Sequence, residues 1–157
     1  MQLITRSSEQ TQSLGKVIGA ALTKGAVFAL SGDLGCGKTV FVQGLAIGIG
    51  VSEDEYITSP TFTLINEYHG RLTLTHVDLY RLDTMSDIDD IGFEEALESG
   101  GVVAIEWADK LSANDMQPDV HIHIEMLDHQ MRQITIWPEE NDFSTVIAKW
   151  SKELICD

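Results

Sequence analysis

Residues 32–39, Gly-Asp-Leu-Gly-Cys-Gly-Lys-Thr, have the residue types and the spacing needed to bind phosphate groups. They satisfy the pattern G-x-x-x-x-G-K-[ST], in which glycines let successive backbone N–H groups point at an anion. The pattern predicts that Lys38 reaches the β- and γ-phosphates and that the Thr39 hydroxyl binds magnesium. The sequence therefore predicts a P-loop for a nucleoside triphosphate and Mg²⁺, with contacts expected from Asp33, Leu34, Gly35, Cys36, Gly37, Lys38, Thr39 and Val40.

Phosphoryl transfer also needs an acidic group near the metal ion and a group that orients water or an acceptor. Asp78 and Glu106 each follow an apolar run, residues 72–77 and 102–105. Ligand sites in open α/β sheets lie outside the carboxyl ends of the strands, so both carboxylates face the P-loop if their strands run parallel to residues 26–30. The residues alone do not decide which carboxylate binds magnesium and which orients water.

Ser59, Pro60 and Thr61 lie in the connection after the P-loop helix, where switch segments of nucleotide hydrolases are often found. A hydroxyl group there could contact the γ-phosphate or the metal ion and order the loop. The alternative is a turn that starts a strand, with Pro60 fixing the backbone. The residues leave both interpretations open.

Cys36 lies inside the P-loop, where the helix N-terminus and Lys38 could lower its pKa and make it a reactive thiol. The alternative is a small residue that fits the turn. No resolving cysteine lies nearby, which favours the alternative.

Hydrophobic periodicity indicates the elements that must position these residues. A first helix is expected with Ser7 or Ser8 as its cap and Gly25 at its end, and further helices over residues 38–49, 87–98 and 143–154. Strands are expected over residues 26–30, 61–68, 72–78, 102–105, 120–126 and 131–137. These elements predict an α/β fold with a P-loop NTPase-like mixed sheet flanked by helices, a β-hairpin and an antiparallel C-terminal pair. We expect a single P-loop ATPase domain over residues 1–157.

The formal charge of −15 comes from 25 acidic and 10 basic residues, which argues against direct nucleic-acid binding. Two cysteines, Cys36 and Cys156, are too few for a disulfide framework and fit a reducing compartment. No apolar run approaches the roughly 20 residues that span a bilayer, and residues 1–10 contain no signal-peptide core. We expect a cytoplasmic protein that binds neither DNA nor a membrane.

Three further patterns favour structural over functional interpretations. Residues 89–92 match D-x-x-G, but no guanine-reading N-K-x-D or T-K-x-D follows, so a turn is expected. His121, His123 and Glu125 alternate with apolar residues, which predicts the solvated face of a half-buried strand rather than a metal site. The aromatic side chains of Trp137, Phe143 and Trp150 are expected in the core.

Four sequence blocks in order resemble the bacterial TsaE (YjeE) family of small P-loop ATPases. They are residues 32–39, Ser59-Pro60-Thr61-Phe62-Thr63-Leu64, His76-Val77-Asp78-Leu79-Tyr80-Arg81-Leu82 and Glu106-Trp107. The resemblance covers nearly the whole chain. It implies a role in forming threonylcarbamoyladenosine in tRNA beside a TsaD–TsaB pair, in which TsaD transfers the carbamoyl group. It also implies that this chain binds and hydrolyses ATP with Mg²⁺, supports repeated rounds of modification, and meets tRNA only indirectly.

The resemblance also implies roles for individual residues. Lys38 matches the phosphate-binding lysine, Thr39 the magnesium-binding hydroxyl, Glu106 a further metal-associated carboxylate, Asp78 a Walker-B-like acid, and Thr61 a switch-like threonine. Catalysis is thus expected of Lys38, Thr61, Asp78 and Glu106, and metal binding of Thr39, Asp78 and Glu106. Trp107 either lines the nucleotide site or belongs to the core. Cys36 departs from the family pattern, in which alanine is common at this place.

Two other functional classes share the P-loop. A small-molecule kinase usually needs an acceptor subdomain and lid arginines, and only Arg71, Arg81 and Arg132 follow the P-loop, with no basic insertion. A nucleotide-sensing adaptor without turnover is barely distinguished from a slow ATPase by its motifs. Turnover measurements separate the two.

Overall fold

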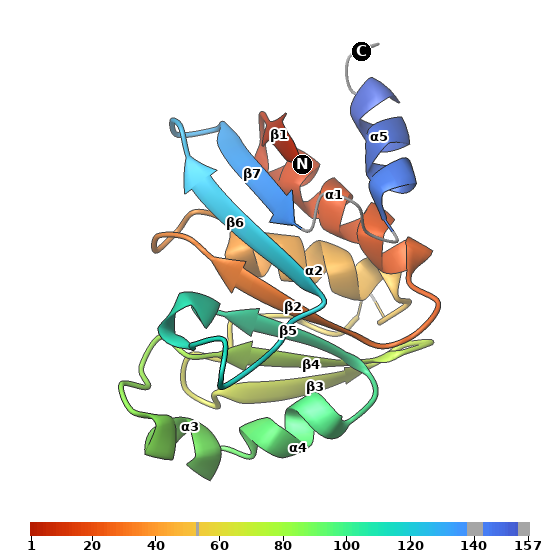
Figure 1. Ribbon diagram of the computed structural model, residues 1–157. Helices are drawn as coiled ribbons and strands as arrows, with labels where there is room; N and C mark the ends of the chain where they lie inside the picture. Colours follow the sequence, from red (N-terminus) through yellow and green to blue (C-terminus); the bar gives the residue numbers. More distant parts are fainter. Residues whose placement is uncertain (53, 138–142, 154–157) are drawn as a thin grey trace.

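A seven-stranded mixed sheet forms the centre of the computed structural model, which describes residues 1–52, 54–137 and 143–153 (Figure 1). The strands are β1 (Gln2–Thr5), β2 (Ala26–Ser31), β3 (Ile65–His69), β4 (Thr73–Asp78), β5 (Val102–Glu106), β6 (Val120–Met126) and β7 (Arg132–Trp137), in the order β1-β7-β6-β2-β5-β4-β3. Strands β4, β5, β2 and β6 are parallel to one another, whereas β3, β7 and β1 pair antiparallel at the edges. The predicted mixed sheet, hairpin and antiparallel C-terminal pair are therefore confirmed.

Helices cover both faces of the sheet. On one face lie α1 (Ser8–Ala21), α2 (Lys38–Gly48) and α5 (Ser144–Glu153); on the other lie α3 (Met85–Asp90), α4 (Phe93–Glu98) and the short 3-10 helix η1 (Ala108–Lys110). Successive side chains of β2 point to opposite faces of the sheet and so divide the core into two clusters. Phe28 and Leu30 pack in the cluster with α1 and α2, and Ala29 packs in the cluster on the other face. Residues that alternate along β4 and β5 therefore also point to one or the other helical layer.

The helix that follows the P-loop lies unusually close to α1. A Cβ atom at Gly15 would come within 2.2 Å of the Phe41 carbonyl oxygen, and one at Gly44 within 1.9 Å of the Gln12 carbonyl oxygen. Only glycine permits this approach of two backbones. The contact fixes α2, and with it the glycine-rich loop of residues 32–39 before it, against the rest of the fold.

Three elements differ from the sequence-based expectation. Strand β1 is not predicted by the sequence, because its four residues are too few for a period-two signal; antiparallel pairing with β7 holds it. The single helix expected over residues 87–98 is wrong, because Gly92 adopts a left-handed conformation (φ 80°) and separates α3 from α4. Strand β3 starts at Ile65 rather than residue 61, because the Leu64 N–H donates to the Pro60 carbonyl oxygen in a turn.

Two of the three aromatic residues expected in the core are there. Phe143 and Trp150 are buried, and the Trp150 indole N–H donates to the Ser13 hydroxyl 3.0 Å away. Trp137 is 39% exposed, so its assignment to the core is wrong. Among the described residues, no helix is long and apolar enough to cross a bilayer.

Candidate nucleotide site

The loop between β2 and α2 has the backbone geometry of a phosphate cradle. Gly32, Gly35 and Gly37 all have positive φ angles, of 133°, 78° and 116°. A Cβ atom at Gly32 would lie 2.2 Å from the Ile124 carbonyl oxygen, whereas nothing lies within 4 Å of one at Gly35. Gly37 is the N-cap residue of α2, and it supplies no side-chain cap. The first N–H groups of α2 are therefore available to an anion.

Lys38 is held directly over this loop. Its side chain is almost fully buried, and its Nζ donates to the carbonyl oxygens of Gly32 (2.6 Å) and Asp33 (2.9 Å). The same Nζ lies 4.0 Å from the centroid of the Trp107 ring, a cation–π contact. Trp107 is the residue after β5 and has a left-handed backbone (φ 61°), which turns its ring under the lysine.

Thr39 and Glu106 meet at the mouth of the loop. Glu106 is the last residue of β5, and its Oε1 accepts a hydrogen bond from the Thr39 Oγ1 at 2.7 Å. Asp78 is the last residue of β4 and pairs in register with Glu106. Because β2, β4 and β5 are parallel, both carboxylates lie at the edge of the sheet from which the P-loop starts.

Asp78 contacts the segment that precedes β3. Its Oδ2 accepts hydrogen bonds from the Ser59 hydroxyl and from the Thr61 hydroxyl, the latter at 3.2 Å. Its Oδ1 accepts from the Tyr80 backbone N–H at 2.9 Å. The two carboxylates therefore have different neighbours: the P-loop threonine for Glu106, and the hydroxyl-bearing segment for Asp78.

A cavity of about 300 Å³ brings most of these residues together. It is lined by Leu34, Gly35, Gly37, Lys38, Thr39, Val40, Ser59, Thr61, Asp78, Tyr80, Glu106 and Trp107. Of the residues predicted to belong to the site, Asp33 and Cys36 do not line it. Asp33 contributes its carbonyl oxygen to Lys38, and Cys36 packs into the core. Trp107 lines this cavity and also packs against a core cluster, so the two alternatives for this residue do not exclude each other.

Cys36 has the environment of a structural thiol. Its side chain is fully buried, and this burial raises the pKa of the thiol above its ordinary value, although the nearby Lys38 ammonium acts in the opposite direction. The thiolate is the reactive species, so a raised pKa lowers reactivity at neutral pH. The structure favours the small residue that fits the turn over the reactive thiol.

We expect Cys36 to resist labelling by a thiol reagent such as Ellman's reagent in the native protein. In a Cys156→Ser variant, where Cys36 is the remaining cysteine, the native rate at pH 8 should fall at least about 100-fold below the rate in guanidinium chloride. Burial and the raised pKa both lower the labelling rate. Burial restricts access of the reagent, and the raised pKa leaves less thiolate than a free thiol has at that pH. Labelling at the rate of the unfolded chain would contradict this environment.

The sequence predicts no role for two residues that contact the site. His76 is fully buried on β4, and its Nε2 lies 2.8 Å from the Glu106 Oε1. Arg132, at the start of β7, lies behind the P-loop, where its Nε donates to the Cys36 carbonyl oxygen at 3.2 Å. The sequence indicates Arg132 only as a candidate lid arginine. A basic residue at the start of an amphipathic strand gives no signal of a contact 96 positions away.

We expect Arg132→Met to weaken ATP binding about tenfold. The substitution leaves the Cys36 carbonyl without its charged donor, and hydrogen bonds to charged groups contribute about 1.5–3 kcal/mol. Isothermal titration with ATP and Mg²⁺ measures the change, and Arg6→Met, at an exposed position, is the matched control. Wild-type affinity in Arg132→Met would show that the P-loop does not depend on this support.

The other arginines considered for a lid do not line the cavity either. Arg71 donates through its guanidinium to the carbonyl oxygens of Gly19 and Leu22, at the C-terminal end of α1. Arg81 rests on the ring of Phe62, with 4.4 Å between its Cζ and the ring centroid. Among the described residues, no arginine lines the cavity that contains Lys38.

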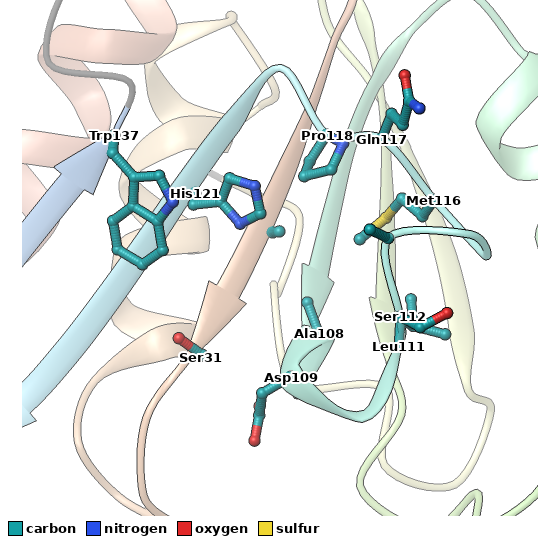
Figure 2. A pocket seen from close by; sticks show the side chains of 12 residues that line it. Ser31, Ala108, Asp109, Leu111, Ser112, Met116, Gln117, Pro118, His121 and Trp137 are labelled. Atoms are coloured by element: carbon teal, nitrogen blue, oxygen red, sulfur yellow. The ribbon is translucent and has the colours of Figure 1, made fainter.

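A larger cavity, of about 490 Å³, lies between β6 and the loop after η1 (Figure 2). Trp137 and His121 form one wall, with their rings stacked at 5.1 Å, and burial lowers the pKa of His121. None of the residues predicted to bind nucleotide lines this cavity. The larger cavity is therefore not the one that the residues predicted to bind nucleotide line.

The chain is similar to known proteins in both sequence and fold. A family model described as TsaE, threonylcarbamoyl adenosine biosynthesis protein, matches residues 5–134, which contain every residue predicted for the site. The tRNA threonylcarbamoyladenosine biosynthesis protein TsaE of Treponema pallidum (strain Nichols) is 44% identical over 136 residues, covering 87% of this chain and 99% of that protein. The protein of the same name from Nostoc sp. (strain PCC 7120 / SAG 25.82 / UTEX 2576) is 40% identical over 153 residues, covering 94% and 91%.

A solved structure has the same fold over nearly its full length. The crystal structure of Bacillus subtilis YdiB matches with a TM-score of 0.68 and 31% sequence identity, covering 98% of this chain and 95% of that one. The family match extends over most of the chain, and its range contains residues 32–39, Asp78 and Glu106. The chain belongs to the TsaE family.

Proposed function

We propose that this protein is a magnesium-dependent ATP-binding protein and slow ATPase that supports threonylcarbamoyladenosine modification of tRNA together with a TsaD–TsaB complex. The observation that carries the proposal is the contact between Thr39 and Glu106 at the mouth of a glycine-rich loop that also holds Lys38. The family and the names of its relatives support the pathway. The chemistry rests on the geometry of the chain's own residues.

The donor set fits Mg²⁺, a hard cation that prefers oxygen ligands and is bound in such sites by one or two carboxylates and the phosphates. Thr39 would hold the ion directly, and Glu106, 2.7 Å from the Thr39 hydroxyl, would bind it directly or through a water molecule. When bound, Mg²⁺ supplies positive charge to the β- and γ-phosphate oxygens. Lys38 and the N-terminal amides of α2 would bind the same phosphates.

We assign different roles to the two carboxylates. Glu106 belongs to the metal site, because its hydrogen-bond partner is the P-loop threonine. Asp78 positions the segment that contains Ser59 and Thr61, because it accepts hydrogen bonds from both hydroxyl groups. That segment lines the cavity and is placed to respond to the γ-phosphate or to orient water.

The charges around the cavity support slow turnover by the protein alone. No arginine lines it among the described residues, and an arginine finger contributes about 10³–10⁵ to kcat in related P-loop enzymes. Leu34 and Tyr80 line the cavity yet are 70% and 43% exposed, and Phe62 beside Arg81 is also exposed. Exposed apolar side chains around the mouth of the cavity favour binding of a partner protein, which would cover the cavity and complete the site.

The test of the proposal is reconstituted tRNA modification with TsaD–TsaB, tRNA and the threonylcarbamoyl donor. With the wild-type chain, the product should exceed one modified tRNA per complex; with Lys38→Ala it should stay at or below one. The net charge of −15 leads us to expect no tRNA binding by the chain alone at physiological salt. Multiple turnovers with Lys38→Ala, or without this chain, would overturn the proposed role.

A further inference from the structure

His76 is a buried polar residue that contacts the proposed metal site through Glu106. It lies on β4, two residues before Asp78, and pairs in register with Ala104 on β5. Alternation along β4 turns its side chain to the same face as Leu74, which packs in the cluster with α2. Its side chain is fully buried, in a strand where an apolar residue would satisfy packing.

The imidazole and the P-loop threonine share one carboxylate oxygen. His76 Nε2 lies 2.8 Å from Glu106 Oε1, and the Thr39 Oγ1 donates to the same atom at 2.7 Å. An ionised carboxylate only accepts hydrogen bonds, so the network assigns the hydrogen of this contact to the Nε2 of His76. Two donors on Oε1 hold this oxygen in place, and Oε2 would then be the oxygen available to a metal ion or its water.

The other ring nitrogen argues against a purely structural role. His76 Nδ1 is buried and has no hydrogen-bond partner among the described residues. Leaving a buried polar atom unpaired costs free energy, and a leucine or methionine would fill the same space without that cost. The hydrogen bond between the His76 Nε2 and Glu106 is the interaction that offsets this cost.

We propose that His76 is a positioning residue of the magnesium site, which acts by holding Glu106 in the orientation that meets Thr39. The inference rests on the proposed function and deepens it. Groups that orient metal ligands typically change metal affinity 10–100-fold when they are replaced. His76 itself touches neither nucleotide nor metal in this scheme; its effect passes through the Glu106 carboxylate.

The test compares His76→Gln, whose amide reaches about as far as Nε2, with His76→Asn, whose shorter amide does not reach Glu106. ATP affinity is titrated calorimetrically in EDTA and over a series of Mg²⁺ concentrations. We expect His76→Asn to raise the Mg²⁺ concentration for half-maximal tightening about 10–100-fold. ATP affinity in EDTA should stay within about twofold of the wild type, and His76→Gln should recover most of the Mg²⁺ response.

Controls separate this role from folding and from the proposed function. Thr75→Val changes the neighbouring buried residue on the opposite face of β4 and should keep the wild-type Mg²⁺ response. Circular dichroism and thermal unfolding confirm that each variant is folded. Wild-type Mg²⁺ dependence in His76→Asn, or an equal loss in His76→Gln, would overturn the positioning role while leaving the proposed function intact. A wild-type protein without Mg²⁺-coupled ATP binding would instead overturn the proposed function, and this inference with it.

Discussion

Lys38→Ala should weaken ATP binding at least about 100-fold, because a charge-assisted hydrogen bond to phosphate contributes about 1.5–3 kcal/mol and each 1.4 kcal/mol is a factor of ten. Lys38 is expected to make two such contacts, to the β- and γ-phosphates. Its ammonium group is buried between the loop carbonyls and the Trp107 ring, where the effective dielectric constant is lower than in water.

The measurement is isothermal titration of each variant with ATP at saturating Mg²⁺. Lys24→Ala removes the same charge from an exposed position and should bind ATP as the wild type does. Lys38→Arg should recover little, because the planar guanidinium does not fit a site built for a compact ammonium. If Lys38→Ala bound ATP as tightly as the wild type, the P-loop assignment would be wrong.

Glu106→Gln should lower kcat for ATP hydrolysis about 100-fold or more, since loss of one preorganised electrostatic contact typically costs 10²–10³. The amide keeps the shape of the carboxylate but removes its charge beside Thr39. The Mg²⁺ dependence of ATP binding should therefore weaken in the same variant. Steady-state hydrolysis and a Mg²⁺ titration of ATP affinity measure the two effects.

Asp78→Asn is the matched variant, because Asp78 pairs in register with Glu106 at the same edge of the sheet. It should also slow hydrolysis but leave the Mg²⁺ dependence of ATP binding near that of the wild type. The reason is that its side-chain partners are Ser59 and Thr61 rather than the P-loop threonine. The reverse pattern, with Mg²⁺ coupling lost in Asp78→Asn and retained in Glu106→Gln, would exchange the two roles.

The parts of the site that could be predicted from the sequence are those whose signal is local. The P-loop is a contiguous pattern, and its glycines have the positive φ angles that the pattern requires. Asp78 and Glu106 could be found because each ends an apolar run, and parallel strands bring such ends to one edge. Thr61 lies within reach of Asp78, although its segment forms a turn rather than the start of β3.

The parts that could not be predicted depend on contacts between distant segments. In the sequence, His76 is a single polar residue within an expected strand, and its partner Glu106 is 30 positions away. Arg132 supports a loop 96 positions earlier in the chain. Strand β1 exists because β7 offers an edge to pair with, and the break between α3 and α4 depends on the backbone of a single glycine, Gly92. The periodicity of hydrophobic residues along the sequence does not indicate such contacts.

The most direct test of the proposed function is Mg²⁺-dependent ATP hydrolysis by the purified protein, alone and with TsaD–TsaB, with Lys38→Ala as the control. We expect slow turnover by the protein alone, an increase of at least about tenfold with the partner complex, and loss of both in Lys38→Ala. Binding of ATP without turnover in either condition would contradict the ATPase role and favour a nucleotide-sensing adaptor. Turnover that does not change with the partners would contradict the partner-regulated role.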